Sequence, residues 1–94
     1  MQESDGIRGL ESMRDEIRKI DDQIMGLVIR RSEVAREIGV LKKKHGMPIL
    51  DVQREAFNIQ RNRDIARDKI PEAMVDEWTD LLANWAREIQ KMAR

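Results

Sequence analysis

The feature that most constrains this chain is a long series of apolar residues spaced alternately three and four positions apart. Its members are Leu10, Met13, Ile17, Ile20, Ile24, Leu27, Val34, Ile38 and Leu41, and the series is interrupted once, at Arg31. Such spacing places the apolar side chains in one stripe along an α-helix. Gly46 and then Pro48 follow the stripe, and this order is typical of a helix end. The pattern predicts one helix over residues 7–45.

Two glycines, Gly26 and Gly39, lie inside this helix, and each disfavours it by about 1 kcal/mol relative to alanine. A break at Gly26 is the competing interpretation, although the stripe keeps its phase across both glycines. The unbroken helix would be about 58 Å long, whereas a compact domain of this size has a radius of gyration of about 12 Å. Its own chain cannot cover such a helix. We therefore predict an intertwined homodimer in which two long helices pack together.

Two shorter helices are predicted after the long one. Asp51 is a favourable N-cap for a helix over residues 51–67, and Pro71 suits the first turn of a helix over residues 71–93. Apolar residues recur at helical spacing in the last segment, and its two tryptophans, Trp78 and Trp85, are expected in the core.

The predicted fold is therefore all-α, with three helices per chain and one of them very long, in an intertwined homodimeric helical bundle. Residues 1–94 are expected to form one domain. Residues 1–6 precede the apolar pattern, and we expect them to be disordered.

The composition argues against several classes of function. The 18 basic and 18 acidic residues balance, which argues against a nucleic-acid partner. With no cysteine, disulfides and thiolate metal sites are excluded. The only histidine, His45, is interpreted as a solvated cation at a helix end, and the carboxylates form no pattern typical of a metal site. No apolar run reaches a membrane span, and the first ten residues lack a signal-peptide core, so a cytoplasmic protein is predicted.

Arg31 is the informative departure from the apolar stripe. A buried guanidinium is costly unless an anion meets it. Its partner is either a carboxylate of the protein, such as Glu55, or a carboxylate of a ligand, which a guanidinium grips with two parallel hydrogen bonds. Arg14 and Lys42 lie too far apart along one helix to touch the same small molecule. In an antiparallel pair of long helices, however, Arg14 of one subunit can approach Lys42 and Arg31 of the other, so shared sites are predicted.

The stretch from Met13 to Glu55, MRDEIRKIDDQIMGLVIRRSEVAREIGVLKKKHGMPILDVQRE, resembles the all-helical class of chorismate mutases. The similarity lies in the joint order of R-xx-I-xx-ID, a mid-helix arginine and K-xxx-G-x-P-xx-D-xx-RE, and it continues more weakly to Gln90. This resemblance implies an isomerase that rearranges chorismate to prephenate on the route to phenylalanine and tyrosine. It also implies a domain-swapped homodimer with two composite sites and no cofactor.

The resemblance further implies a catalytic group of four residues. Lys42 matches the cationic donor to the ether oxygen of the substrate, and Gln90 matches the side-chain amide that meets the same atom. Arg31 matches the arginine that binds one substrate carboxylate. Arg14 matches the arginine that reaches in from the other subunit.

Four more positions are implied to bind the substrate. Arg54 matches an arginine on the carboxylate side, while Glu55 and Asp51 match acidic residues near the ring hydroxyl. Ala86 departs from the family pattern, because relatives often carry a hydroxyl or an amide there and a methyl group cannot donate a hydrogen bond. In the third helix, a one-residue shift of the alignment would bring Trp85 or Arg87 toward the site.

Two kinds of alternative stay open. On the same scaffold, the chain could be an isochorismate-pyruvate lyase or a mutase of aminodeoxychorismate. From another class, it could be a non-catalytic helical dimerisation module whose arginines pair with its own carboxylates.

Overall fold

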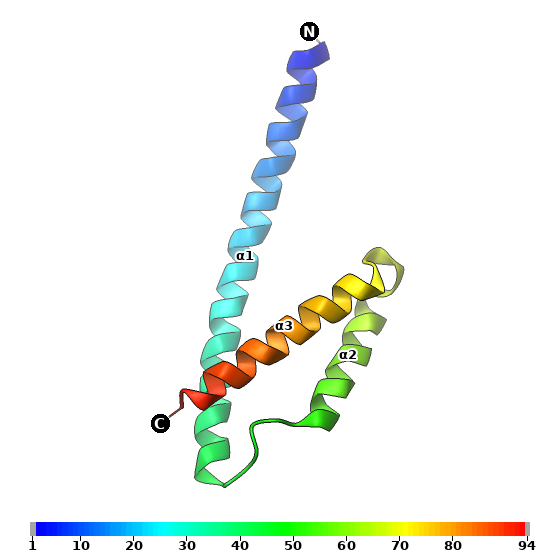
Figure 1. Ribbon diagram of the computed structural model, residues 1–94. Coiled ribbons are helices and arrows are strands. Elements are labelled where there is room, and N and C mark those ends of the chain that lie inside the picture. The colour runs from blue at the N-terminus through cyan, green and yellow to red at the C-terminus, as the bar shows by residue number, and fades with distance from the viewer. Residues whose placement is uncertain (1, 94) are drawn as a thin grey trace. The chain divides into compact units, whose positions relative to one another are not determined.

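The all-α prediction is confirmed by a computed structural model, which describes residues 2–93. The helices are α1 (Gln2–Lys44), α2 (Val52–Ala66) and α3 (Glu72–Lys91), with a short 3-10 helix η1 (Arg67–Lys69) between the last two (Figure 1). The long helix passes through Gly26 and Gly39 without a break. The helix starts at Gln2, before the predicted start at residue 7, and Met1 lies outside the described residues. The expected disorder of residues 1–6 stays a prediction. No proline precedes Pro48, and a helix once nucleated propagates at little cost.

The end of α1 follows the predicted glycine signal. Gly46 has a positive φ of 64°, which glycine adopts without steric cost. The Met47 N–H donates to the carbonyl of Lys42 at 2.8 Å, and the Gly46 N–H donates to that of Lys43 at 3.4 Å. This pair of bonds is a Schellman motif. It ends the helix and turns the chain directly after the lysine cluster.

The starts of α2 and α3 differ in how they are capped. Asp51 is the N-cap of α2, as predicted, and its side chain accepts a hydrogen bond from the Arg54 N–H. Pro71 lies one position outside α3 and has an extended ψ of 136°. The helix therefore begins at Glu72, and Pro71 precedes its first turn, although the sequence predicted Pro71 within that turn.

The contacts divide the chain into two compact units, Met1–Arg31 and Ser32–Arg94. The described part of the first unit is the N-terminal part of α1. Its large apolar side chains from Ile7 to Ile29 are between 47% and 70% exposed, apart from Val28, which is half-buried.

The second unit contains the buried residues Ala35, Val75, Thr79 and Leu82. Its helices α2 and α3 lie side by side (Figure 1). Between them, the Thr79 hydroxyl accepts a hydrogen bond from the Asn62 amide at 2.9 Å and donates to the Val75 carbonyl at 2.7 Å. A buried polar group is thus fully paired in this small core.

The tryptophans, expected in the core, are half-exposed in the single chain. Trp78 is 52% exposed and Trp85 is 45% exposed in the single chain, because the apolar face of α3 is wider than the core that its own unit provides. Trp78 instead lines an apolar groove of about 560 Å³, together with Ile65, Ile70, Met74 and Val75 among others. Within residues 2–93, no helix is both long enough and apolar enough to cross a bilayer.

Candidate active site

Lys42 is held at the end of α1 by the turn that follows it. Its carbonyl accepts from the Met47 N–H in the helix-ending motif, and its ammonium donates to the Ile49 carbonyl at 2.8 Å. The side chain is half-buried. The backbone carbonyl and the side-chain ammonium of Lys42 are therefore both held by hydrogen bonds to the loop that follows α1.

Gln90 comes from the last turn of α3 and meets Lys42 across 48 residues of sequence. The Lys42 ammonium donates to the Gln90 side-chain oxygen at 2.9 Å. Because an ammonium only donates, this bond assigns the amide orientation and turns the amide N–H groups away from the lysine. The two groups expected at one substrate atom lie together in the structure.

Glu55, on α2, has an ion pair with Arg87 on α3. The Arg87 guanidinium donates to both carboxylate oxygens, and the two side chains are 29% and 27% exposed. Arg87 and Gln90 are three residues apart and thus share one face of α3. From the sequence, Arg87 was expected near the site only under a shifted alignment; in the structure it pairs with Glu55 and lies on the face of α3 that carries Gln90.

The start of α2 carries two more predicted residues of the second unit, Asp51 and Arg54. The Asp51 carboxylate accepts from the Arg54 N–H at 3.0 Å, so the capping interpretation of Asp51 is confirmed. The Arg54 guanidinium carbon lies 5.4 Å from the centre of the Phe57 ring, a distance typical of a cation–π contact. Both Asp51 and Arg54 are exposed, whereas Ala86 on α3 is half-buried.

The remaining two predicted residues, Arg14 and Arg31, lie on the first unit. Both are exposed in the single chain. Arg14 lines a shallow hollow of about 350 Å³ on the surface of α1 with Glu11, Asp15 and Arg18. The Arg18 guanidinium is paired with the Asp15 carboxylate at 2.8 Å. The arrangement of these arginines with the second unit's residues stays a prediction.

A second charged cluster joins the far ends of α2 and α3, and sequence analysis did not single it out. Arg63 donates to both carboxylate oxygens of Asp76, at 2.8 Å from its Nε, and its Nε lies 3.6 Å from Glu72. The hydrogen bond from Arg63 lowers the pKa of Asp76, with burial acting in the opposite direction. The same hydrogen bond raises the already high pKa of Arg63.

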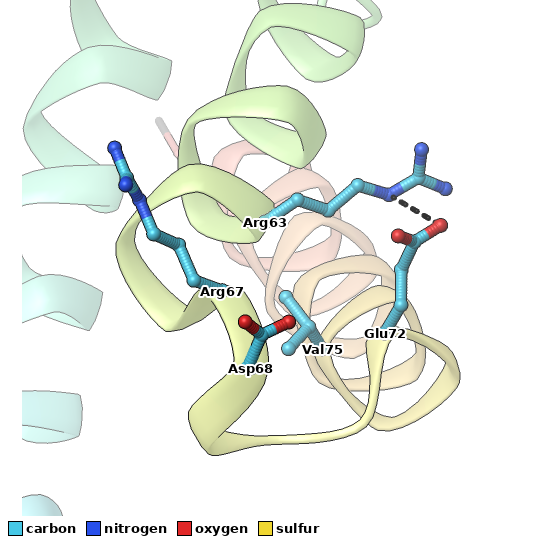
Figure 2. Close-up of a pocket in the computed structure, with 5 residues that line it drawn as sticks. All are labelled: Arg63, Arg67, Asp68, Glu72 and Val75. Carbon is cyan, nitrogen blue, oxygen red and sulfur yellow. Dashed lines mark ion pairs between the residues drawn. The ribbon is translucent and has the colours of Figure 1, made fainter.

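This cluster borders a hollow of about 300 Å³ that is lined by Arg63, Arg67, Asp68, Glu72 and Val75 (Figure 2). Figure 2 shows the guanidinium groups of Arg63 and Arg67 pointing in opposite directions. Because Arg63 is paired with acidic residues of α3, we interpret the cluster as a structural link between the two helices. The part of the chain that the structure describes contains no group of three or more His, Cys, Asp or Glu that could hold a metal ion.

Comparison with known proteins gave one family and several partial relatives. The profile of the family "Chorismate mutase type II" matches residues 13–91. The chain is 31% identical over 62 residues to the chorismate mutase of Methanocaldococcus jannaschii, covering 66% of this chain and 63% of that protein. It is 34% identical over 68 residues to the intracellular chorismate mutase of Mycobacterium tuberculosis, covering 72% and 65%.

A third relative has another name. The 3-dehydroquinate dehydratase of Pyrobaculum aerophilum is 41% identical over 56 residues, which is 60% of this chain but only 19% of that protein. The chain thus spans less than two thirds of each of these three relatives. No solved structure matches the chain significantly.

Proposed function

Since the chain belongs to the chorismate mutase type II family, we propose that it is an isomerase that rearranges chorismate to prephenate. The observation that carries this proposal is the hydrogen bond between Lys42 and Gln90. This bond joins a cation and an amide from helices distant in sequence, and it supports a shared role for them at one substrate oxygen. The reaction is unimolecular, and no cofactor is proposed.

The chemistry that these two groups would perform is electrostatic. Breaking of the ether bond leads bond formation, so negative charge grows on the ether oxygen in the transition state. Lys42 carries three N–H donors, and the outward amide N–H groups of Gln90 add another donor. Donors already in place for developing charge lower the barrier without reorganisation. Holding the substrate in its compact form supplies a further share of the acceleration.

The substrate is a dianion, and the proposal assigns its carboxylates to arginines. Arg31 and Arg54 would bind from one subunit and Arg14 from the other. Glu55 would accept from the ring hydroxyl, with Asp51 nearby, and the ion pair with Arg87 holds the Glu55 carboxylate in a defined orientation. Ala86 offers no side-chain donor, and Arg87, the next residue, is the nearest candidate in sequence to substitute for one.

A homodimer with shared sites is part of this proposal. It is supported by the exposed stripe of the first unit, where Ile17 and Leu27 are 57% and 70% exposed, and by the apolar groove beside Trp78. Apolar surface of this extent is typical of an interface. A cytoplasmic location is likewise proposed, supported by a relative that is named an intracellular chorismate mutase.

The direct test is an assay of purified protein with chorismate, followed by its ultraviolet absorbance and by product identification. Prephenate as the product is the expected result. Pyruvate and salicylate from isochorismate would identify a lyase, turnover of aminodeoxychorismate alone would identify the related mutase, and no turnover of any of these substrates would favour a dimerisation module. Each of these other outcomes would overturn the proposal.

The lysine assignment has its own test with a matched control. Lys42→Ala should lower kcat by about 100-fold or more, because a donor to developing charge is lost. Lys43→Ala removes the same charge from an exposed neighbour at the same helix end and should keep activity close to that of the wild type. Circular dichroism should show both variants folded. Nearly intact activity in folded Lys42→Ala would contradict the mechanism.

A further inference from the structure

Gly39 is buried on α1 against the end of α3, three residues before Lys42. A Cβ atom at this position would lie 2.7 Å from the Gln90 carbonyl oxygen, 2.8 Å from its Cα and 2.9 Å from the Ala93 Cβ. Ordinary contacts to a Cβ begin at 3.4 Å, and two of the three atoms here are backbone. A side chain at Gly39 would therefore have to push the last turn of α3 away by about 0.7 Å, because no side-chain rotation can relieve the contact.

The atoms in contact with Gly39 belong to the residue that completes the site. The Gln90 carbonyl also accepts from the Ala93 N–H at 3.1 Å in the terminal turn of α3, so the turn moves as one piece with the Gln90 side chain. On α1, residues three and four apart share a face, and Ala35, Gly39 and Lys42 form one such row. The close approach at Gly39 and the 2.9 Å bond between Lys42 and Gln90 therefore belong to one contact between α1 and the last turn of α3.

We infer that Gly39 is a positioning residue: by having no side chain, it lets α3 come close enough for Gln90 to share the substrate's ether oxygen with Lys42. This inference rests on the proposed mutase function. It also explains why a poor helix former occupies the interior of α1 at this position. At Gly26 in the same helix, an added Cβ would have no neighbouring atom within 4 Å, which makes Gly26 the natural control.

The test compares kcat and KM of the wild type, Gly39→Ala, Gly26→Ala, Gln90→Ala and the double variant Gly39→Ala/Gln90→Ala. Gly39→Ala should lower kcat by about 10- to 100-fold, the effect of a misplaced catalytic group, with a smaller change in KM. Gly26→Ala should behave like the wild type. In the Gln90→Ala background, Gly39→Ala should cost little more, because the group it misplaces is already absent.

Two kinetic results would overturn the inference: wild-type kcat in Gly39→Ala, or an equally large loss in the Gln90→Ala background. The second would mean that Gly39 acts on the fold in general. If Gly39→Ala does not fold, Gln90→Asn tests the same requirement for a short distance between the amide and Lys42. It shortens the side chain by one methylene and leaves the contact between the helices unchanged. Its kcat should fall by a similar factor, and an unchanged kcat would contradict the inference.

Structures of the wild type and Gly39→Ala separate this inference from the proposed function. If the wild type does not convert chorismate, the function fails, yet the distance between Lys42 Nζ and Gln90 Oε1 still tests the role of Gly39. The distance should rise from 2.9 Å beyond the hydrogen-bonding range in Gly39→Ala. An unchanged distance would overturn the inference whatever the activity.

Discussion

The two units of this chain differ in how they use apolar residues. In the first, the described residues are one helical segment whose stripe is exposed, with Ile20 and Ile24 at 49% and 47%. In the second, three helical segments enclose a small core and pair their polar groups. An exposed apolar stripe with regular spacing is typical of a helix face that packs against a partner. The second unit holds most of the proposed site, and the first unit holds Arg14 and Arg31. In the proposed dimer, the apolar stripe of the first unit packs against a second copy of the chain.

The largest effect should come from a charge placed on that stripe. Ile20→Glu should abolish the dimer and with it the mutase activity, because burying an unpaired carboxylate costs several kcal/mol. Sedimentation velocity and the chorismate assay measure both consequences. Lys19→Gln changes the net charge by the same amount beside the stripe and should leave both unchanged. If Ile20→Glu still sediments as a dimer and stays active, the stripe of the first unit is not the dimer interface.

A smaller effect is expected from the polar link within the second unit. The pKa of Asp76 is lowered by the hydrogen bond from Arg63, so its stabilising contribution is present above the pKa of an unfolded aspartate, about 3.9. That contribution is lost as the pH falls through the lower folded pKa. Asp76→Asn should therefore lower Tm at neutral pH, and the gap from the wild type should close under strong acid.

Thermal unfolding over a series of pH values checks this prediction. Asp80→Asn, at an exposed position of the same helix, is the control and should change Tm little at any pH. A gap between the wild type and Asp76→Asn that stays constant into strong acid would show that the pair does not act through ionisation.

The smallest effect concerns the turn between α2 and α3. Arg67 has a φ of 44° and a ψ of −126°, a sparsely populated backbone conformation that costs a residue with a side chain about 1 to 3 kcal/mol. Its Nε also donates to the Asp64 carbonyl at 3.1 Å. Arg67→Gly should consequently be more stable than Arg67→Ala by about 1 kcal/mol, because both variants lose the side-chain bond and only glycine relieves the backbone. Urea unfolding of the two variants tests this, and equal midpoints would show that the turn relaxes.

The features that sequence predicted are those with local signals. The period of the apolar stripe indicated α1, Gly46 indicated its end, and Asp51 indicated the start of α2. The positive φ of Arg67 was missed because arginine carries no preference for it. The exposure of Trp78 and Trp85 was missed because helical spacing shows which face is apolar and not what covers it.

The residues of the candidate site also differ in whether the sequence alone could identify them. Lys42 and Gln90 were named from a family resemblance and meet in the structure. The pairing of Glu55 with Arg87 depends on how α2 packs against α3 across 32 residues of sequence, which local patterns do not report. In the sequence, Gly39 could be assessed only as an unfavourable residue within a helix. Its proposed positioning role depends on the contact with Gln90, which only the structure shows. Arg14 and Arg31 stay predictions, because their role needs a second subunit.

Mixing two inactive variants tests the shared site most directly. Arg14→Ala removes a residue from the first unit and Lys42→Ala removes one from the second. A mixed dimer assembles one site that has both residues, so equal mixing with free exchange should restore about one quarter of wild-type activity. Native mass spectrometry confirms that mixed dimers form. Activity no higher than that of either variant alone, with mixed dimers present, would contradict a site built from two chains.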